Sequence, residues 1–177
     1  MILKNNFILA YIKIKASNEG PPLLWAGGLG SKTMGSGDGK QFSGKYGSDA
    51  KPDRSIRDLI LKREQSGELP CAVAFEIAKD HGVAPVEVGK NIDLLNFSLV
   101  KCQLGLFGYH PKKKIVKSLP TVAQDLKDAI REALVEGRLS CEKAWRIASR
   151  LKVPKMKVSG ACETMGIKIK PCQLGAF

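Results

Sequence analysis

The chain lacks the residue patterns on which most enzymes and metal sites depend. It has only 2 histidines, and aromatic residues make up 6% of its 177 residues. No two cysteines follow the C-x₂-C spacing typical of zinc sites. There is also no Ser/His/Asp set, no paired carboxylates and no cofactor-binding fingerprint. We therefore predict that the protein is not an enzyme and binds neither a cofactor nor a metal.

Long apolar stretches are missing as well. No segment approaches the roughly 20 apolar residues that a membrane-spanning helix needs. The run FILAYI at residues 7–12 is followed at once by Lys13 and is too short for the core of a signal peptide. Cysteines without a secretory signal are typical of reduced, intracellular thiols. We expect a cytoplasmic protein with no membrane partner.

What the chain does have is an internal repeat. Residues 58–107 align with residues 128–177 at a constant offset of 70 without a gap, and 15 of the 50 aligned pairs are identical. Each unit ends in the same motif, CQLGLF in the first and CQLGAF in the second. A duplication of this size predicts two small domains. Each is near the lower limit for a self-sufficient core, so we expect the two to pack together.

Basic residues outnumber acidic ones, and the net charge is +12. Residues 1–54 have eight basic and four acidic residues, and the first repeat, 55–110, has six and seven. The linker, 111–121, has four basic residues and no acidic one, and the second repeat, 122–177, has eleven and six. This imbalance suggests a polyanionic partner lying along the linker and the second repeat, nucleic acid before membrane. The alternative is that the charge serves only solubility.

Residues 1–54 differ in kind from the repeats. The segment 19–51 is rich in glycine, serine and lysine and shows no apolar periodicity, so we predict a flexible arm over residues 1–54. One Gly-Lys pair follows a glycine at the spacing of a phosphate-binding loop. However, Tyr46 occupies the position where such a loop needs a hydroxyl for magnesium. The arm therefore predicts no nucleotide site.

Apolar spacing predicts three helices in each repeat. The first covers 55–66 or 122–136 and ends at a glycine. The second begins near Pro70 or Ser140, because proline suits the first turn of a helix and serine caps one.

The most specific pattern follows that second helix. It reads AKDHGVAPVEVGKNIDLLNF in the first repeat and ASRLKVPKMKVSGACETMGI in the second. A small residue, Ala78, precedes a turn at Gly82, and apolar residues follow at Val88, Ile92 and Leu95. This pattern resembles a helix-turn-helix, in which the alanine lies where two helices cross and the glycine adopts the left-handed turn conformation.

A strand is predicted after the third helix, in FSLVKCQL and IKIKPCQL, and three helices followed by a strand resemble the winged-helix variant. The segment YHPKKKIVK, residues 109–117, would then be a wing. The resemblance implies a mainly α fold with short β strands, made of two tandem helix-turn-helix, winged-helix-like units. The second copy departs from the pattern because Lys152 replaces the turn glycine.

The resemblance also implies a DNA-binding surface on the third helix. Lysines in its first turn would meet phosphates, and small residues would permit close approach. In the first repeat Asn91 has a side chain suited to adenine, but Glu87 repels phosphate. The predicted nucleic-acid-binding residues are Lys155, Lys157, Ser159, Thr164, Lys168, Lys90, Asn91, Lys112, Lys113 and Lys114.

The function that follows is binding of double-stranded DNA through the second repeat, as a transcriptional regulator or an architectural protein. The first repeat is then a degenerate copy or a surface for homodimer formation. The alternative is a protein–protein adaptor whose lysines merely solvate a helix.

Four of the five cysteines are repeated, as the pairs Cys71/Cys141 and Cys102/Cys172. We interpret them as small buried packing residues. In the alternative interpretation Cys71, Cys102, Cys141 and Cys172 make the protein a redox- or metal-responsive regulator.

Overall fold

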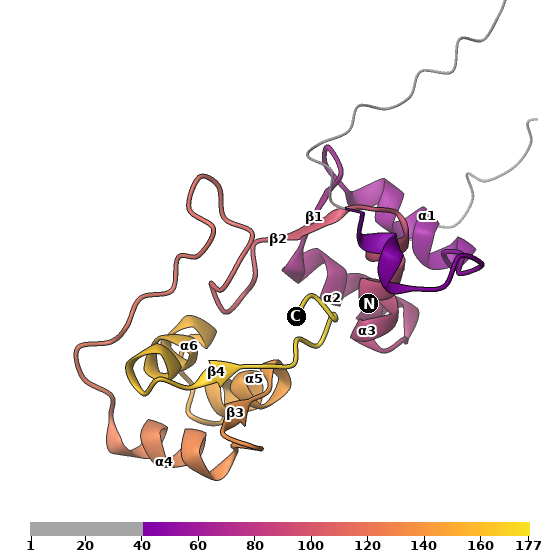
Figure 1. The fold of residues 1–177 in the computed structure, drawn as a ribbon. Helices are drawn as coiled ribbons and strands as arrows, with labels where there is room; N and C mark the ends of the chain where they lie inside the picture. The colour runs from indigo at the N-terminus through magenta and orange to yellow at the C-terminus, as the bar shows by residue number, and fades with distance from the viewer. Residues whose placement is uncertain (1–40) are drawn as a thin grey trace, which may run out of the picture. The chain divides into compact units, whose positions relative to one another are not determined.

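The computed structural model describes residues 41–177 (Figure 1). The first repeat contains α1 (Arg54–Arg63), α2 (Cys71–His81) and α3 (Pro85–Leu94), preceded by a short 3₁₀ helix, η1 (Phe42–Lys45). The second repeat contains α4 (Gln124–Glu132), α5 (Cys141–Arg150) and α6 (Lys155–Thr164). The described residues thus repeat one order of helices.

A polar side chain caps the N-terminus of one helix in each repeat. The Asp53 carboxylate accepts hydrogen bonds from the N–H groups of Ser55 and Ile56 at the start of α1. The Ser140 hydroxyl accepts one from the N–H of Lys143 at the start of α5, as predicted. These bonds satisfy N–H groups that have no partner within the helix.

The turn between the second and third helices has the same conformation in both repeats. A left-handed residue ends or follows the second helix, Gly82 with φ 67° or Lys152 with φ 53°. The valine that follows donates its N–H to the carbonyl of Ala78 (3.0 Å) or of Ala148 (2.9 Å). Both alanines are buried. Lys152 adopts a backbone conformation that disfavours side chains by about 1–2 kcal/mol.

Each repeat also contains a pair of short parallel strands. β1 (Glu68–Pro70) pairs with β2 (Ser98–Val100), and β3 (Arg138–Leu139) pairs with β4 (Lys168–Ile169). The first strand of a pair leads into the second helix, and the other strand follows the third helix. Only the later strand of each pair is predicted by the sequence, because two or three residues are too few for an alternating pattern.

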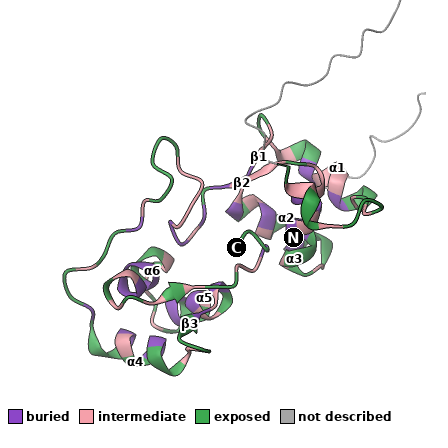
Figure 2. Ribbon diagram, in the orientation of Figure 1, coloured by how far each residue is buried: buried purple, intermediate pink, exposed green. Residues whose placement is uncertain are grey.

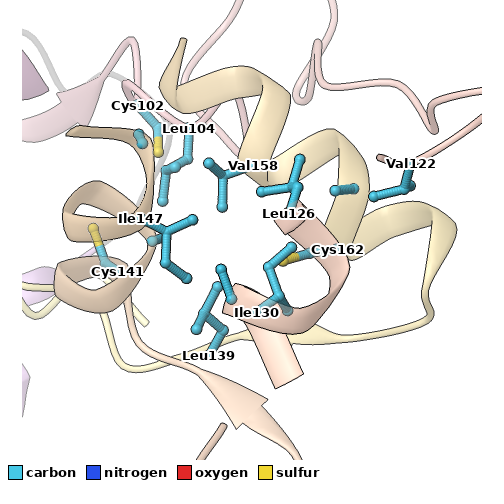
Figure 3. Packing of buried hydrophobic residues seen from close by; sticks show 14 residues of the cluster. Cys102, Leu104, Val122, Leu126, Ile130, Leu139, Cys141, Ile147, Val158 and Cys162 are labelled. Atoms are coloured by element: carbon cyan, nitrogen blue, oxygen red, sulfur yellow. The ribbon is translucent and has the colours of Figure 1, made fainter. Parts of the chain in front are cut away.

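The two CQLG motifs are exchanged between the repeats. Leu104 of the first motif is fully buried in the apolar cluster of the second repeat. Figure 3 shows it beside Ile147 and Val158. Conversely, Leu174 of the second motif belongs to the cluster of the first repeat, which contains Val88. Each repeat therefore completes the core of the other.

Each motif is itself a closed loop. The N–H of Cys102 bonds to the carbonyl of Phe107 at 3.2 Å, and the N–H of Cys172 bonds to that of Phe177 at 3.0 Å. Because the loop is closed by its own hydrogen bond, it is compact, and its leucine side chain inserts into the apolar cluster of the other repeat.

The prediction of a mainly α fold with short strands is confirmed. Of the predicted arm, residues 1–40 lie outside the described residues, whereas η1 contacts α3. The predicted wing, 109–117, contains no strand.

In Figure 2 buried and exposed residues alternate around the helices, as their amphipathic sequences require. Within residues 41–177 no helix is long and apolar enough to span a membrane.

Candidate nucleic-acid interface

Equivalent residues of the two repeats contact each other. The rings of Phe75 and Trp145, which are 70 positions apart, have centroids separated by 4.4 Å. Phe107 and Phe177 are also equivalent, and their rings meet edge to face at 5.6 Å. A contact in which a position meets its own equivalent is characteristic of two-fold symmetric pairing. The two repeats therefore pair internally as the subunits of a symmetric dimer do.

Residues 103–104 and 114–119 lie along α6, the helix predicted to bind DNA. The Ser159 hydroxyl donates a hydrogen bond to the Leu104 carbonyl at 2.7 Å, and Ser159 is fully buried. The Thr164 hydroxyl donates to the Leu119 carbonyl at 2.9 Å and accepts the Leu119 N–H at 2.8 Å. Both side chains are thus engaged within the protein.

The covering segment comes very close to α6. A Cβ atom added at Gly160 would lie 2.9 Å from the Lys117 carbonyl oxygen, closer than real Cβ contacts. Near the end of the helix Lys114 forms an ion pair with Glu163. Small residues on α6 are expected to let DNA approach closely; at Gly160 it is the linker that approaches closely instead.

Lys155 joins the two repeats. Its ammonium group donates a hydrogen bond to Gln103 Oε1 and lies 3.1 Å from the centroid of the Trp145 ring. Burial lowers the pKa of Lys155. A cation on an aromatic face is favourable, and more so when it is partly desolvated. In this arrangement Lys155 serves interdomain packing, and its ammonium group is not free to bind phosphate.

The corresponding face of α3 is covered by the segment before the first repeat. Asn91 is buried, accepts the Asp53 N–H at 2.7 Å and donates to the Glu87 carbonyl at 2.8 Å. Its amide is therefore not available to a base. Lys90 lies 5.8 Å from the ring centroid of Tyr46.

A lysine–carboxylate pair fastens the covering segment in both repeats. Lys45 pairs with Asp93 at 2.9 Å, and Asp93 is the equivalent of Glu163, which pairs with Lys114. The two covers are thus anchored at the same position of the third helix.

Other lysines remain exposed. Seven of them in the linker and second repeat take part in no ion pair within residues 41–177: Lys112, Lys113, Lys117, Lys152, Lys157, Lys168 and Lys170. Four of the seven are among the predicted nucleic-acid-binding residues: Lys112, Lys113, Lys157 and Lys168. The first repeat has Gly82, Glu87, Ser98 and Val100 where the second has Lys152, Lys157, Lys168 and Lys170. The basic surface is consequently a property of the second copy.

The cysteines are mostly buried. Cys71, Cys102, Cys141 and Cys162 are buried and Cys172 is half-buried, so the expectation of burial is confirmed for three of the four repeated cysteines. Within residues 41–177 no three His, Cys, Asp or Glu side chains are grouped so that they would hold a metal ion.

Comparison of the chain with known protein families, curated proteins and solved structures finds no match. Sequence reasoning missed the covering role of Gln103, Leu104 and Leu119. A signal for the first two was present, because they belong to a motif that is nearly identical in both copies while the surrounding residues differ.

Proposed function

We propose that each three-helix unit is a helix-turn-helix and that the second one binds double-stranded DNA through its phosphates. The observation that carries the proposal is the set of exposed lysines in and next to α6, Lys152, Lys157, Lys168 and Lys170, because the first copy has no lysine at the equivalent positions. Lys152 and Lys157 lie in the turn before α6 and in its first helical turn. Backbone N–H groups and lysines at such a position are the usual phosphate-contacting groups of this motif.

Phosphate contacts fit the covered surface better than base readout. Ser159 is bonded to Leu104 of the first repeat and Thr164 to Leu119 of the linker, so the side chains suited to the groove face protein. Three exposed lysines of the linker, Lys112, Lys113 and Lys117, add to those of the second repeat. Binding through lysines to phosphates depends little on sequence and strongly on salt. The function proposed is therefore architectural DNA binding rather than recognition of one operator.

The test exploits the two copies. The full chain is titrated with a random-sequence duplex at several salt concentrations, as wild type and as the variant Lys152→Gly, Lys157→Gln. Each lost phosphate contact lowers the slope of log K against log salt by about 0.9, so the variant should lose nearly two. Lys152→Gly also relieves a left-handed lysine, so lower stability would not explain a loss of binding.

The matched control removes two exposed lysines of the first repeat, Lys62→Gln and Lys79→Gln. It has the same net charge as the test variant and should keep the wild-type slope. Equal losses in both variants would show that overall charge, and not this surface, determines binding. Absence of binding by the wild type at low salt would favour the protein–protein adaptor instead.

A further inference from the structure

Cys141 and Cys172 lie side by side where the β3/β4 pair ends. The pairing continues past the strands, because Cys141 donates its N–H to the Pro171 carbonyl at 3.0 Å. The residue on the other side of Cys172 contacts Cys141 too, because Gln173 Nε2 donates to Cys141 Sγ at 3.4 Å. Both chain neighbours of Cys172 therefore bond to Cys141, which places the two cysteines next to each other. Disulfides form between cysteines that are such close neighbours.

The surroundings of Cys172 favour an anionic sulfur. Cys141 lowers the pKa of Cys172, and the backbone N–H groups of Ala176 and Leu174 in the closed CQLGAF loop lower it further. Successive N–H groups that converge in a tight loop form an anion-binding concavity. The hydrogen bond from Cys141 is the main cause that lowers the pKa of Cys172 to about 6. The same bond, with burial, raises the pKa of Cys141, which therefore keeps the proton while Cys172 is a thiolate.

Cys141 is also held by the motif. Gln173, the residue after Cys172, donates a hydrogen bond from Nε2 to Cys141 Sγ at 3.4 Å. Cys141 is the first residue of α5, where the helix dipole further favours a thiolate once the proton leaves. Cys141 is thus placed to react after Cys172.

The first repeat provides an inert copy of the same pair. Cys71 and Cys102 stand at the equivalent positions, but both are buried, with 5% and 4% of their surface exposed. Burial raises the pKa of Cys71 to about 11 and also raises the pKa of Cys102. Cys172, by contrast, is half-buried. Cys141 is as buried as Cys71, with 5% of its surface exposed, so the two pairs differ in the exposure of Cys172 and Cys102.

We propose that Cys141 and Cys172 are a reactive dithiol that a low-molecular-weight disulfide oxidises to an intramolecular disulfide bond. The Cys172 thiolate attacks one sulfur of the small disulfide, which breaks the S–S bond and releases one thiolate. Cys141 then loses its proton to solvent and attacks Cys172 Sγ, which displaces the second thiolate. Overall two protein thiols are oxidised and the small disulfide is reduced to two thiols.

The test uses the intact reduced chain with oxidised glutathione as the probe at pH 7. Samples are quenched with acid, the remaining thiols are alkylated under denaturing conditions, and peptides are mapped by mass spectrometry. A glutathione adduct on Cys172 should appear first and be replaced by the Cys141–Cys172 disulfide. Cys172 should react at least about tenfold faster than Cys102, because only a thiolate attacks.

Two variants separate the steps. Cys141→Ser should stop the reaction at the glutathione adduct of Cys172, and Cys172→Ser should prevent both products. Cys102→Ser is the matched control and should leave formation of the Cys141–Cys172 disulfide unchanged. Reaction of Cys71 and Cys102 at the same rate in the wild-type chain would overturn the proposal, as would a Cys172 that stays unmodified. The wild-type mapping decides this even where a variant fails to fold.

Discussion

Truncation of Leu104 tests the exchange of motifs between the repeats. Leu104 belongs to the first repeat by sequence, yet it is fully buried in the cluster of the second. Removal of a buried leucine side chain costs about 2–5 kcal/mol through lost transfer free energy and the remaining cavity. Leu104→Ala should therefore lower the free energy of unfolding by that amount, measured by denaturant titration.

Double-mutant cycles show in which of the two cores Leu104→Ala loses its stabilising contacts. Leu104→Ala is combined with Val158→Ala of the second repeat and, separately, with Val88→Ala at the equivalent position of the first. The first combination shares a core, so it should show an interaction energy of about 0.5–3 kcal/mol. The second should be additive within about 0.5 kcal/mol. For Leu174→Ala the pattern should reverse, because Leu174 lies in the cluster of Val88.

The opposite pattern of interaction energies would refute the exchange of motifs. Coupling of Leu104 to Val88, with additivity toward Val158, would mean that each motif packs on its own repeat. Unchanged stability of Leu104→Ala would mean that the motif is not part of a core.

Three further predictions concern single sites. Gly89→Ala should destabilise the fold by at least about 1–3 kcal/mol in a denaturant titration, because its Cβ would lie 1.8 Å from the Leu174 carbonyl oxygen; a neutral effect would place this motif farther from α3. Ala148→Leu should overpack the helix contact by about 1–3 kcal/mol and lower Tm, and an unchanged Tm would contradict the turn assigned there. The pKa of Cys172 is lower in the folded chain than its ordinary value of 9.0, so its contribution to stability is complete above about pH 9 and is lost as the pH falls through about 6. Unfolding titrations across this range should show that Cys172→Ala lacks this dependence, and an identical pH profile for variant and wild type would refute the assignment.

Local features of the fold are predictable from the sequence because they depend on near neighbours in the chain. Apolar spacing locates the helices, and the turn at Gly82 follows from its freedom to adopt a positive φ. The Ser140 cap follows from the same kind of local chemistry. Helix ends are less well predicted: α4 covers Gln124–Glu132, whereas the pattern extends over 122–136. The apolar residues flanking α4 join the core without being helical.

The candidate site is predicted only in part. The charge difference between the copies points to lysines of the second repeat, and of these Lys157 and Lys168 are exposed. Lys155 has the same sequence context as Lys157, yet it pairs with Gln103 and stacks on Trp145. No pattern along the chain distinguishes these lysines, since the partners are contributed by segments far away in the sequence.

By itself the sequence determined the repeat, the helices, the turns and the charge of the second copy, because each is set by residue type and spacing. Only the tertiary structure decided where the two CQLG motifs pack. The two motifs are nearly identical and the two cores share most of their residue types, so residue type alone does not assign a motif to a core. The contacts that depend on this packing, such as the buried Ser159 hydroxyl bonded to the Leu104 carbonyl, join residues far apart in the sequence and are visible only in the tertiary structure.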